Sequence, residues 1–384
     1  MKEETGSGKS HEKQSVFLKG EKQSIFLTGA TGLVGSYLLK ELLIQGNSVA
    51  VLVRRSRKES AQQRIEKLVQ NWENQLGKKL SRPIVIEGGL ADPSWGSANQ
   101  EWFKEYCGSI IHCAASLTFN GKQGGEPWSS NIEGTRNVLN VCKNAGIRTL
   151  HYVSTAYIAG SSEAFLEDSF DVGQTLRNDY EKSKFQAEKM VREVDFLDSL
   201  TVYRPSIVVG DSQTGYTLTY HGFYAVLKLA HTLAKRMPFT VGRGVRTLVT
   251  LGMSGSEHKN FVPVDWVASV FMRIFRNPQW HGKTYHLTNP NPPLILDFVE
   301  VVQEAVEKYS EFSDENDAMV ATEDWFQENY AMQIAIYEPY LQDDPDFDTR
   351  NVQAAAGDLP CPRMTKDLMM FLAKKAILSD FGKK

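Results

Sequence analysis

The sequence has no run of about 18 apolar residues, so we expect no membrane-spanning helix. It has no excess of charge of one sign either, since 43 Lys and Arg residues stand against 46 Asp and Glu residues among 384. This balance gives no indication of nucleic-acid binding, because nucleic-acid-binding domains are usually strongly basic. Cysteine is scarce, and the four residues, Cys107, Cys113, Cys142 and Cys361, lie far apart. Their spacing predicts no metal site and favours reduced thiols in a cytoplasmic protein.

Both ends of the chain are rich in charged residues. Residues 1–23 lack the apolar stretch of a signal peptide and predict a flexible polar tail. The "GSGKS" in this tail does not predict a phosphate-binding loop, because that motif requires a glycine where Glu3 stands. At the other end, "DLMMFLAKKAILSDFGKK" interleaves apolar and basic residues. We expect a helix docked on the core there, with weak membrane association as the alternative.

Short apolar runs typical of strands alternate with helical patterns over the first half of the chain. This alternation predicts an α/β fold, a doubly wound parallel sheet with helices on both faces. The runs that predict strands are 24–28, 48–53, 83–87, 109–114, 148–154 and 200–204.

The break in this alternation after the sixth strand predicts the domain organisation. We expect a nucleotide-binding (Rossmann) domain over 24–210, completed by a helix and a strand within about 260–290. The ranges 211–259 and 291–384 predict a smaller, mostly helical substrate-binding lobe. The acidic stretch from about 311 to 351 is expected to form helices and loops of this lobe.

A glycine triplet, Gly29, Gly32 and Gly35, follows the first predicted strand and enters the first predicted helix. In this context the first glycine permits a tight turn and the second lets the backbone approach a pyrophosphate. The third lets helix and strand pack closely, while the helix N-terminus offers free N–H groups to the anion. The sequence therefore predicts a dinucleotide site.

The second predicted strand ends in "LVRRSR", with no acidic residue at its tip. An Asp or Glu there would bind a ribose 2′-hydroxyl and repel a 2′-phosphate. Arg54 and Arg55 can instead bind that phosphate through charge-assisted hydrogen bonds. This favours NADP(H) over NAD(H) as the cofactor, with a solvated basic turn as the alternative.

Tyr180 and Lys184 lie one helical turn apart in "DYEKSKFQAEK", after the fifth predicted strand. Thr155 follows that strand, at the sheet edge where ligands of doubly wound folds bind. We expect Tyr180 to act as general acid toward a carbonyl oxygen and Lys184 to lower its pKa. Thr155 would stabilise the developing oxyanion. A surface tyrosine is the alternative, and the equally spaced pair Tyr224 and Lys228 shows that spacing alone is weak evidence.

These motifs together resemble an extended short-chain dehydrogenase/reductase of the fatty acyl reductase and thioester reductase branch, which includes the reductase domains of carboxylic acid reductases. The similar segments are "TGATGLVG", "LVRRSR", "IIHCAASLTF", "VSTAY", "YEKSK", "YRPSIVVGDSQTG" and "NFVPVDWVA", and the resemblance runs from about 24 to 290. It implies that Tyr180 and Lys184 also contact the cofactor. The further cofactor-binding residues that it implies are Thr31, Leu33, Val34, Arg64, Gly89, Leu90, Ala114, Ala115 and Pro205.

The same resemblance implies a substrate class. The branch uses NADPH to reduce a fatty acyl or peptidyl thioester, carried on CoA or a carrier protein, to an aldehyde and in some members to an alcohol. The chain departs from the branch at Gly89, where an aspartate is common, so the adenine contact of that aspartate is in doubt.

Two other functions stay open on the sequence. The first is an NADP-dependent dehydrogenase, reductase or epimerase acting on an alcohol, a ketone or a nucleotide sugar. The apolar stretch "TYHGFYAVLKLAHTLA" suits an acyl chain better than a nucleotide diphosphate, although ordinary lobe core is an equally good interpretation. The second is a non-enzymatic redox sensor, which would not need Tyr180. For His221 a structural role is favoured over substrate contact, and Asp265 is expected to cap a helix.

Overall fold

The computed structural model describes residues 23–121, 124–234, 248, 252–310 and 342–383. The predicted tail, apart from its last residue, and most of the acidic stretch expected at 311–351 lie outside the described residues.

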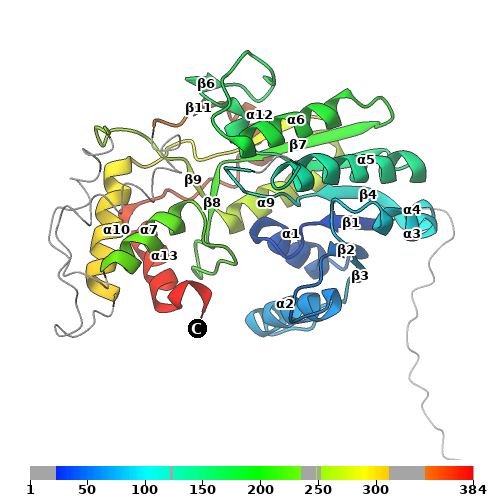
Figure 1. Cartoon of the computed structure of the whole chain (residues 1–384), viewed down its shortest axis with the longest axis horizontal. Helices are drawn as coiled ribbons and strands as arrows, with labels where there is room; N and C mark the ends of the chain where they lie inside the picture. Colours follow the sequence, from blue (N-terminus) through cyan, green and yellow to red (C-terminus); the bar gives the residue numbers. More distant parts are fainter. Residues whose placement is uncertain (1–22, 122–123, 235–247, 249–251, 311–341, 384) are drawn as a thin grey trace, which may run out of the picture.

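A seven-stranded parallel sheet forms the centre of the molecule, with strand order β10-β7-β5-β4-β1-β2-β3 (Figure 1). The doubly wound fold predicted from the sequence is therefore confirmed. Each of the six strand predictions overlaps a strand, and the seventh strand lies in the range expected to complete the domain. The strands are β1 (Ser24–Thr28), β2 (Val49–Val53), β3 (Ile84–Glu87), β4 (Cys107–His112), β5 (Thr149–Val153), β7 (Ser199–Pro205) and β10 (Thr284–Leu287).

Helices cover both faces of this sheet and bury its alternating side chains. In β2, for example, Val51 belongs to one apolar cluster and Ala50 to the other. One face carries α1 (Leu33–Ile44), α2 (Ala61–Leu76) and α9 (Val264–Phe275). The other carries α3 (Ser94–Ala98), α4 (Gln100–Tyr106), α5 (Gly134–Ala145) and α6 (Asp179–Glu193). The result is a three-layer arrangement, and folds of this kind bind their ligands at the carboxyl edge of the sheet.

Three helices form a separate apolar cluster beside the sheet, at the left of Figure 1. They are α7 (Phe223–Ala234), α10 (Ile295–Tyr309) and α13 (Lys366–Leu378). Met369 and Leu372 of α13 are fully buried in this cluster, so the C-terminal segment docks on the fold as predicted.

Short elements join this cluster to the sheet. Strands β8 (Ile207–Val209) and β9 (Phe261–Pro263) pair in parallel, as do β6 (Ala164–Phe165) and β11 (Asp346–Phe347). Helix α12 (Arg350–Ala356) packs against α9 and β10, although its residues fall in the range predicted for the lobe. The remaining short helices are η1 (Ser129–Glu133), η2 (Ala156–Ala159), η3 (Pro278–Trp280) and η5 (Asp380–Gly382). In the described part of the chain, every helix is too short or too polar to cross a membrane.

Candidate active site

The glycine turn between β1 and α1 has the geometry that its sequence predicts. Gly29 has φ +80°, and a Cβ there would lie 2.7 Å from the backbone nitrogen of Ala114. A Cβ on Gly35 would lie 2.1 Å from the carbonyl oxygen of Gly29. Both positions therefore require glycine, the first for its conformation and the second for helix–strand contact.

The N-terminus of α1 is open to an anion. Gly32 is the N-cap, so no side chain caps the first turn, and a Cβ there would meet only Gly29 O, at 3.4 Å. The side chain of Leu33 is buried in the core, while Thr31 and Val34 are half-buried. These residues fit a bound pyrophosphate, which would accept hydrogen bonds from the backbone.

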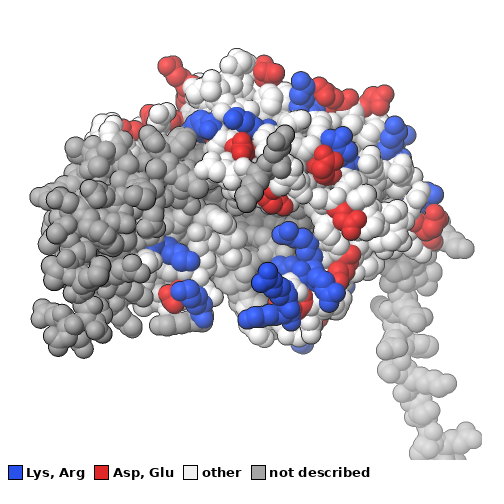
Figure 2. Space-filling view, in the orientation of Figure 1, with Lys and Arg blue, Asp and Glu red and all other residues white. Residues whose placement is uncertain are grey.

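Basic side chains follow β2 and begin α2. Arg54 and Arg55 are exposed, and Arg64 Nη1 donates a hydrogen bond to the Arg54 carbonyl oxygen at 2.5 Å. Arg55 Nε lies 3.9 Å from a carboxylate oxygen of Glu87 at the end of β3. Figure 2 shows Lys and Arg side chains gathered on this face, over α2. The three arginines that the sequence singled out thus converge at the edge of the predicted cofactor site.

The turns after β3 and β4 hold the predicted adenosine-side residues. Gly89 is open, since a Cβ there would meet nothing within 4 Å. Leu90 is buried, and its carbonyl oxygen accepts a hydrogen bond from Asn137 Nδ2 at 3.0 Å. The backbone of Ala114 is held by Thr28 Oγ1 at 3.1 Å, while Ala115 is exposed. Leu90 therefore supports this edge from within, and Gly89 and Ala115 face outward.

Thr155, Tyr180 and Lys184 come together at the carboxyl edge of the sheet. Thr155 follows β5, and its side chain acts on the Tyr180 hydroxyl, whose pKa it lowers. Its Oγ1 also lies 3.5 Å from the carbonyl oxygen of Pro205, at the end of β7. Lys184 is buried one turn beyond Tyr180, and its Nζ donates to Tyr152 Oη at 2.9 Å and to a backbone carbonyl at 2.8 Å.

The pKa shifts of this cluster differ from the expectation. Burial raises the pKa of Tyr180 to about 12, against the lowering effect of its hydrogen bond with Thr155. Burial lowers the pKa of Lys184 to about 8, against the raising effect of the Glu188 and Cys113 charges. The expected lowering of the Tyr180 pKa by Lys184 is absent here, because burial lowers the Lys184 pKa to about 8, so the lysine is uncharged where Tyr180 titrates.

Asn131 is part of the site but was missed in the sequence. It lies on η1, with its amide oxygen accepting from Ser116 N at 2.8 Å and its amide nitrogen donating to Ser183 Oγ at 2.8 Å. It therefore fixes the turn after β4 against α6, beside Tyr180. The only signal was its place just before the "EGTRNVL" helix, and nothing in that pattern indicates its partners.

The other singled-out residues have structural positions. Tyr224 is buried in the lobe cluster, and its hydroxyl accepts a hydrogen bond from Gly210 N at 2.9 Å, so the second Tyr/Lys pair is not a catalytic site. His221 is exposed as a whole residue, although its ring is partly buried, and this burial lowers its pKa. The predicted cap at Asp265 is wrong, because Pro263 is the N-cap of α9. The Asp265 carboxylate instead accepts from Ser212 N and Oγ at 2.9 and 2.7 Å.

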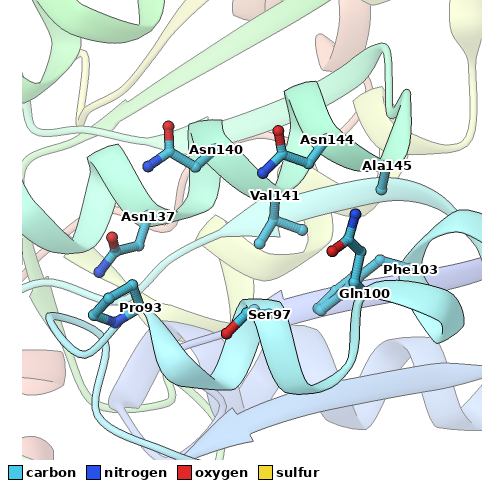
Figure 3. Close-up of a pocket in the computed structure, with 10 residues that line it drawn as sticks. Pro93, Ser97, Gln100, Phe103, Asn137, Asn140, Val141, Asn144 and Ala145 are labelled. Carbon is cyan, nitrogen blue, oxygen red and sulfur yellow. The ribbon is translucent and has the colours of Figure 1, made fainter.

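A pocket elsewhere on the molecule includes none of the predicted site residues. It lies between α3, α4 and α5, and Figure 3 shows the amides of Asn137, Asn140, Asn144 and Gln100 along it. In the described part of the chain, no group of His, Cys, Asp and Glu side chains could hold a metal ion.

A dinucleotide cradle on a doubly wound sheet, with a tyrosine and a lysine at the carboxyl edge, defines the class of NAD(P)-dependent oxidoreductases. The family model described as "Male sterility protein", an NAD-binding model, matches residues 27–271. Because this match covers more than half of the chain, the chain belongs to that family. It is an NAD(P)-dependent oxidoreductase of the extended short-chain dehydrogenase/reductase type, as the resemblance implied.

Among curated proteins, the chain is 26% identical over 296 residues to aldehyde reductase lnbA of Aspergillus flavus. That match covers 70% of this chain but only 27% of the relative, so the chain spans about a quarter of its length. Among solved structures, it is similar to the terminal R domain from the myxalamid PKS-NRPS pathway, with TM-score 0.69, 23% identity and 95% and 93% coverage of the two chains. The reductase domain of a Mycobacterium tuberculosis nonribosomal peptide synthetase is also similar, with TM-score 0.64 and 21% identity. That match covers 94% of this chain and 92% of the other.

Proposed function

We propose that this protein uses NADPH to reduce an acyl thioester, carried on CoA or on a carrier protein, to the aldehyde. The observation that carries the proposal is that Thr155 and Tyr180 interact at the carboxyl edge of the sheet, with Lys184 one turn away. A second reduction by the same residues would convert the aldehyde to the alcohol.

The bound dinucleotide would supply the hydride that adds to the thioester carbonyl carbon. Tyr180 then gives its proton to the carbonyl oxygen, and Thr155 donates a hydrogen bond to the charge that develops there. The hemithioacetal returns that proton to the Tyr180 phenolate as its C–S bond breaks. The sulfur leaves as thiolate, takes a proton from water, and the aldehyde is released.

Lys184 would interact with both the cofactor and Tyr180 during this step. Two of its N–H groups are used by the protein, which leaves one for the cofactor ribose near Tyr180. A positive charge held there would stabilise the phenolate that Tyr180 becomes after proton transfer. The high pKa of the free Tyr180 is consistent with an acid that stays protonated until substrate and cofactor are bound.

The preference for NADPH rests on three arginines. Arg54, Arg55 and Arg64 provide guanidinium groups at the tip of β2, and Glu87, the nearby carboxylate, lies 3.9 Å from Arg55. A 2′-phosphate would be bound by several charge-assisted hydrogen bonds there, whereas a 2′-hydroxyl would gain little.

The proposal of a thioester substrate is supported by the kinds of protein to which the chain is similar. Aldehyde reductase lnbA and nonribosomal peptide synthetase asaC, both of Aspergillus flavus, are among them. The lobe gives less support than the sequence suggested, because Phe223, Tyr224 and Leu227 of the apolar stretch are fully buried as lobe core. That stretch therefore no longer separates an acyl substrate from a nucleotide sugar.

The test is to incubate the protein with NADPH and matched panels of acyl-CoA and acyl-carrier thioesters, ketones and nucleotide sugars. We expect NADPH oxidation coupled to aldehyde release with thioesters alone. Turnover of ketones or epimerisation of nucleotide sugars, with no thioester consumed, would favour the alternative function.

A further inference from the structure

A chain of buried polar side chains lies behind Lys184 and ends at the glycine turn. Tyr152 Oη is 2.9 Å from Lys184 Nζ, and the Thr135 side chain also acts on the Tyr152 hydroxyl. Thr135 Oγ1 is 3.0 Å from His112 Nε2, and His112 Nδ1 is 2.8 Å from Thr28 Oγ1. Each of these five side chains is nearly or fully buried.

The direction of every hydrogen bond in this chain can be assigned. Thr135 donates to the Asn131 carbonyl oxygen at 2.6 Å, so its oxygen is left to accept from His112 Nε2–H at 3.0 Å. His112 is neutral, because burial and the Lys184 charge lower its pKa to about 3, and its Nδ1 then accepts from Thr28. Tyr152 Oη accepts from Lys184, because an ammonium group can only donate.

We propose that Tyr152 is a positioning residue for Lys184. Thr135 and His112 hold the Tyr152 hydroxyl in the orientation that accepts a hydrogen bond from the lysine. The proposal rests on the proposed role of Lys184 in the reduction. Tyr152 and the Val153 carbonyl take two N–H groups of Lys184, and the third is left for the active site. No residue of this hydrogen-bonded chain was among the predicted site residues except Lys184.

The same chain connects Lys184 to the cofactor cradle. Thr28 immediately precedes Gly29, and its Oγ1 accepts from the backbone nitrogens of Cys113 and Ala114 at 3.2 and 3.1 Å. Two cofactor-binding turns and the lysine therefore share one hydrogen-bonded unit. A substitution at Tyr152 should change the pKa of Lys184 without directly altering the two turns.

Other groups that face Lys184 set the background for its titration. Glu188, one turn further along α6, and Cys113, after β4, both raise its pKa. Tyr180 lies on the same helix, while His112 is neutral and Tyr152 stays protonated because burial raises its pKa far above neutrality. Lys184 is thus the member of this group expected to titrate near pH 8.

The test is the pH dependence of kcat/KM and of NADPH affinity in Tyr152→Phe. Loss of an acceptor bound to a charged group should lower the Lys184 pKa by about one pH unit. The alkaline limb of both profiles should therefore move from near pH 8 toward pH 7. Activity at pH 8 should fall about fivefold, with little change at pH 6.

Tyr203→Phe is the matched control, because Tyr203 is an equally buried tyrosine on β7 whose hydroxyl contacts His151 at 3.0 Å. It should leave both limbs in place. Thr135→Val serves as a second variant and should shift the limbs in the same direction as Tyr152→Phe but by less, provided that its melting temperature shows it is folded.

Failure of the positioning role and failure of the proposed function would give different results. A Tyr152→Phe variant that loses activity equally at every pH, with an unshifted NADPH profile, would overturn the positioning role alone. A wild-type protein that binds NADPH but reduces no thioester would overturn the proposed function, while the shift in the NADPH profile would still test Tyr152.

Discussion

At the scale of single residues, the chemistry depends on which tyrosine faces the cofactor cradle. Two Tyr/Lys pairs have the same spacing in the sequence, and only their places in the fold separate them. Tyr180 meets Thr155 at the sheet edge, whereas Tyr224 is buried in the lobe cluster and holds Gly210. The sequence predicted this distinction because Tyr180 lies between the fifth and sixth predicted strands, whereas Tyr224 comes after the sixth, outside the alternating region.

Tyr180→Phe should lower kcat by about 10²- to 10⁴-fold, the usual contribution of a general acid. The NADPH dissociation constant should stay within a few-fold, since the ring is retained. Stopped-flow NADPH oxidation and fluorescence titration measure the two quantities. Reductase activity equal to that of the wild type would show that another group delivers the proton.

Arg54→Ala should weaken NADPH binding by about tenfold or more, because a charge-assisted hydrogen bond contributes roughly 1.5–3 kcal/mol. NADH binding should hardly change, since NADH has no 2′-phosphate. Arg57→Ala, at an exposed arginine of the same loop that was not assigned to the cofactor, is the control. An equal loss of affinity for both nucleotides in Arg54→Ala would remove the phosphate-binding role.

At the scale of elements, the sequence predicted the strands well because buried parallel strands are short, continuous apolar runs. It also predicted the glycine turn, whose conformation is a local property of three residues. It could not predict Asn131, Tyr152 or Thr135, because their partners lie on elements distant in sequence. It overestimated the effect of Lys184 on Tyr180, since a helical spacing does not show the burial that lowers the pKa of the lysine itself.

Gly35→Ala should separate α1 from β1 and weaken both folding and NADPH binding, because its Cβ would lie 2.1 Å from Gly29 O. Overpacking of this kind costs about 1–3 kcal/mol of unfolding free energy. Gly89→Ala is the matched control for stability, since its Cβ would meet nothing within 4 Å. Thermal melting with and without NADPH measures both effects, and a Gly35→Ala protein with the wild-type melting temperature and affinity would contradict the close-packing account.

Glu188→Gln should destabilise the junction of α6 and β7. Glu188 and Arg204 are both fully buried and approach to 2.6 Å, and breaking a buried pair costs about 3–5 kcal/mol. The exposed Glu193→Gln on the same helix should change stability by less than about 0.5 kcal/mol.

The pH dependence of this pair has a definite sign. Burial would raise the pKa of Glu188, but the charge and hydrogen bonds of Arg204 lower it to about 2 from its ordinary 4.5. Its stabilising contribution is therefore complete above pH 4.5 and is lost as the pH falls toward 2. Urea unfolding between pH 3 and 6 should show a smaller acid-induced loss in Glu188→Gln than in the wild type, and an equal loss would assign the effect to other carboxylates.

At the scale of the whole molecule, the alternation of strand and helix patterns predicted the class of fold, and the glycine triplet with Thr155, Tyr180 and Lys184 predicted an enzyme that binds a dinucleotide. They did not predict how the lobe meets the substrate, because an apolar helix has the same pattern whether it faces a ligand or a core. In α7 the core accounts for Phe223, Tyr224 and Leu227. The identity of the acyl group therefore has to be determined by substrate assays rather than from the sequence pattern.

The measurement that tests the central claim most directly uses NADPH deuterated at the transferred position of the nicotinamide, together with an acyl thioester. We predict an aldehyde that carries one deuterium on its carbonyl carbon, formed together with free thiol, and formation of this aldehyde by Tyr180→Phe about 10²- to 10⁴-fold more slowly. Release of thiol without deuterium in the product, or deuterium found only in the product of a ketone or sugar substrate, would contradict the account.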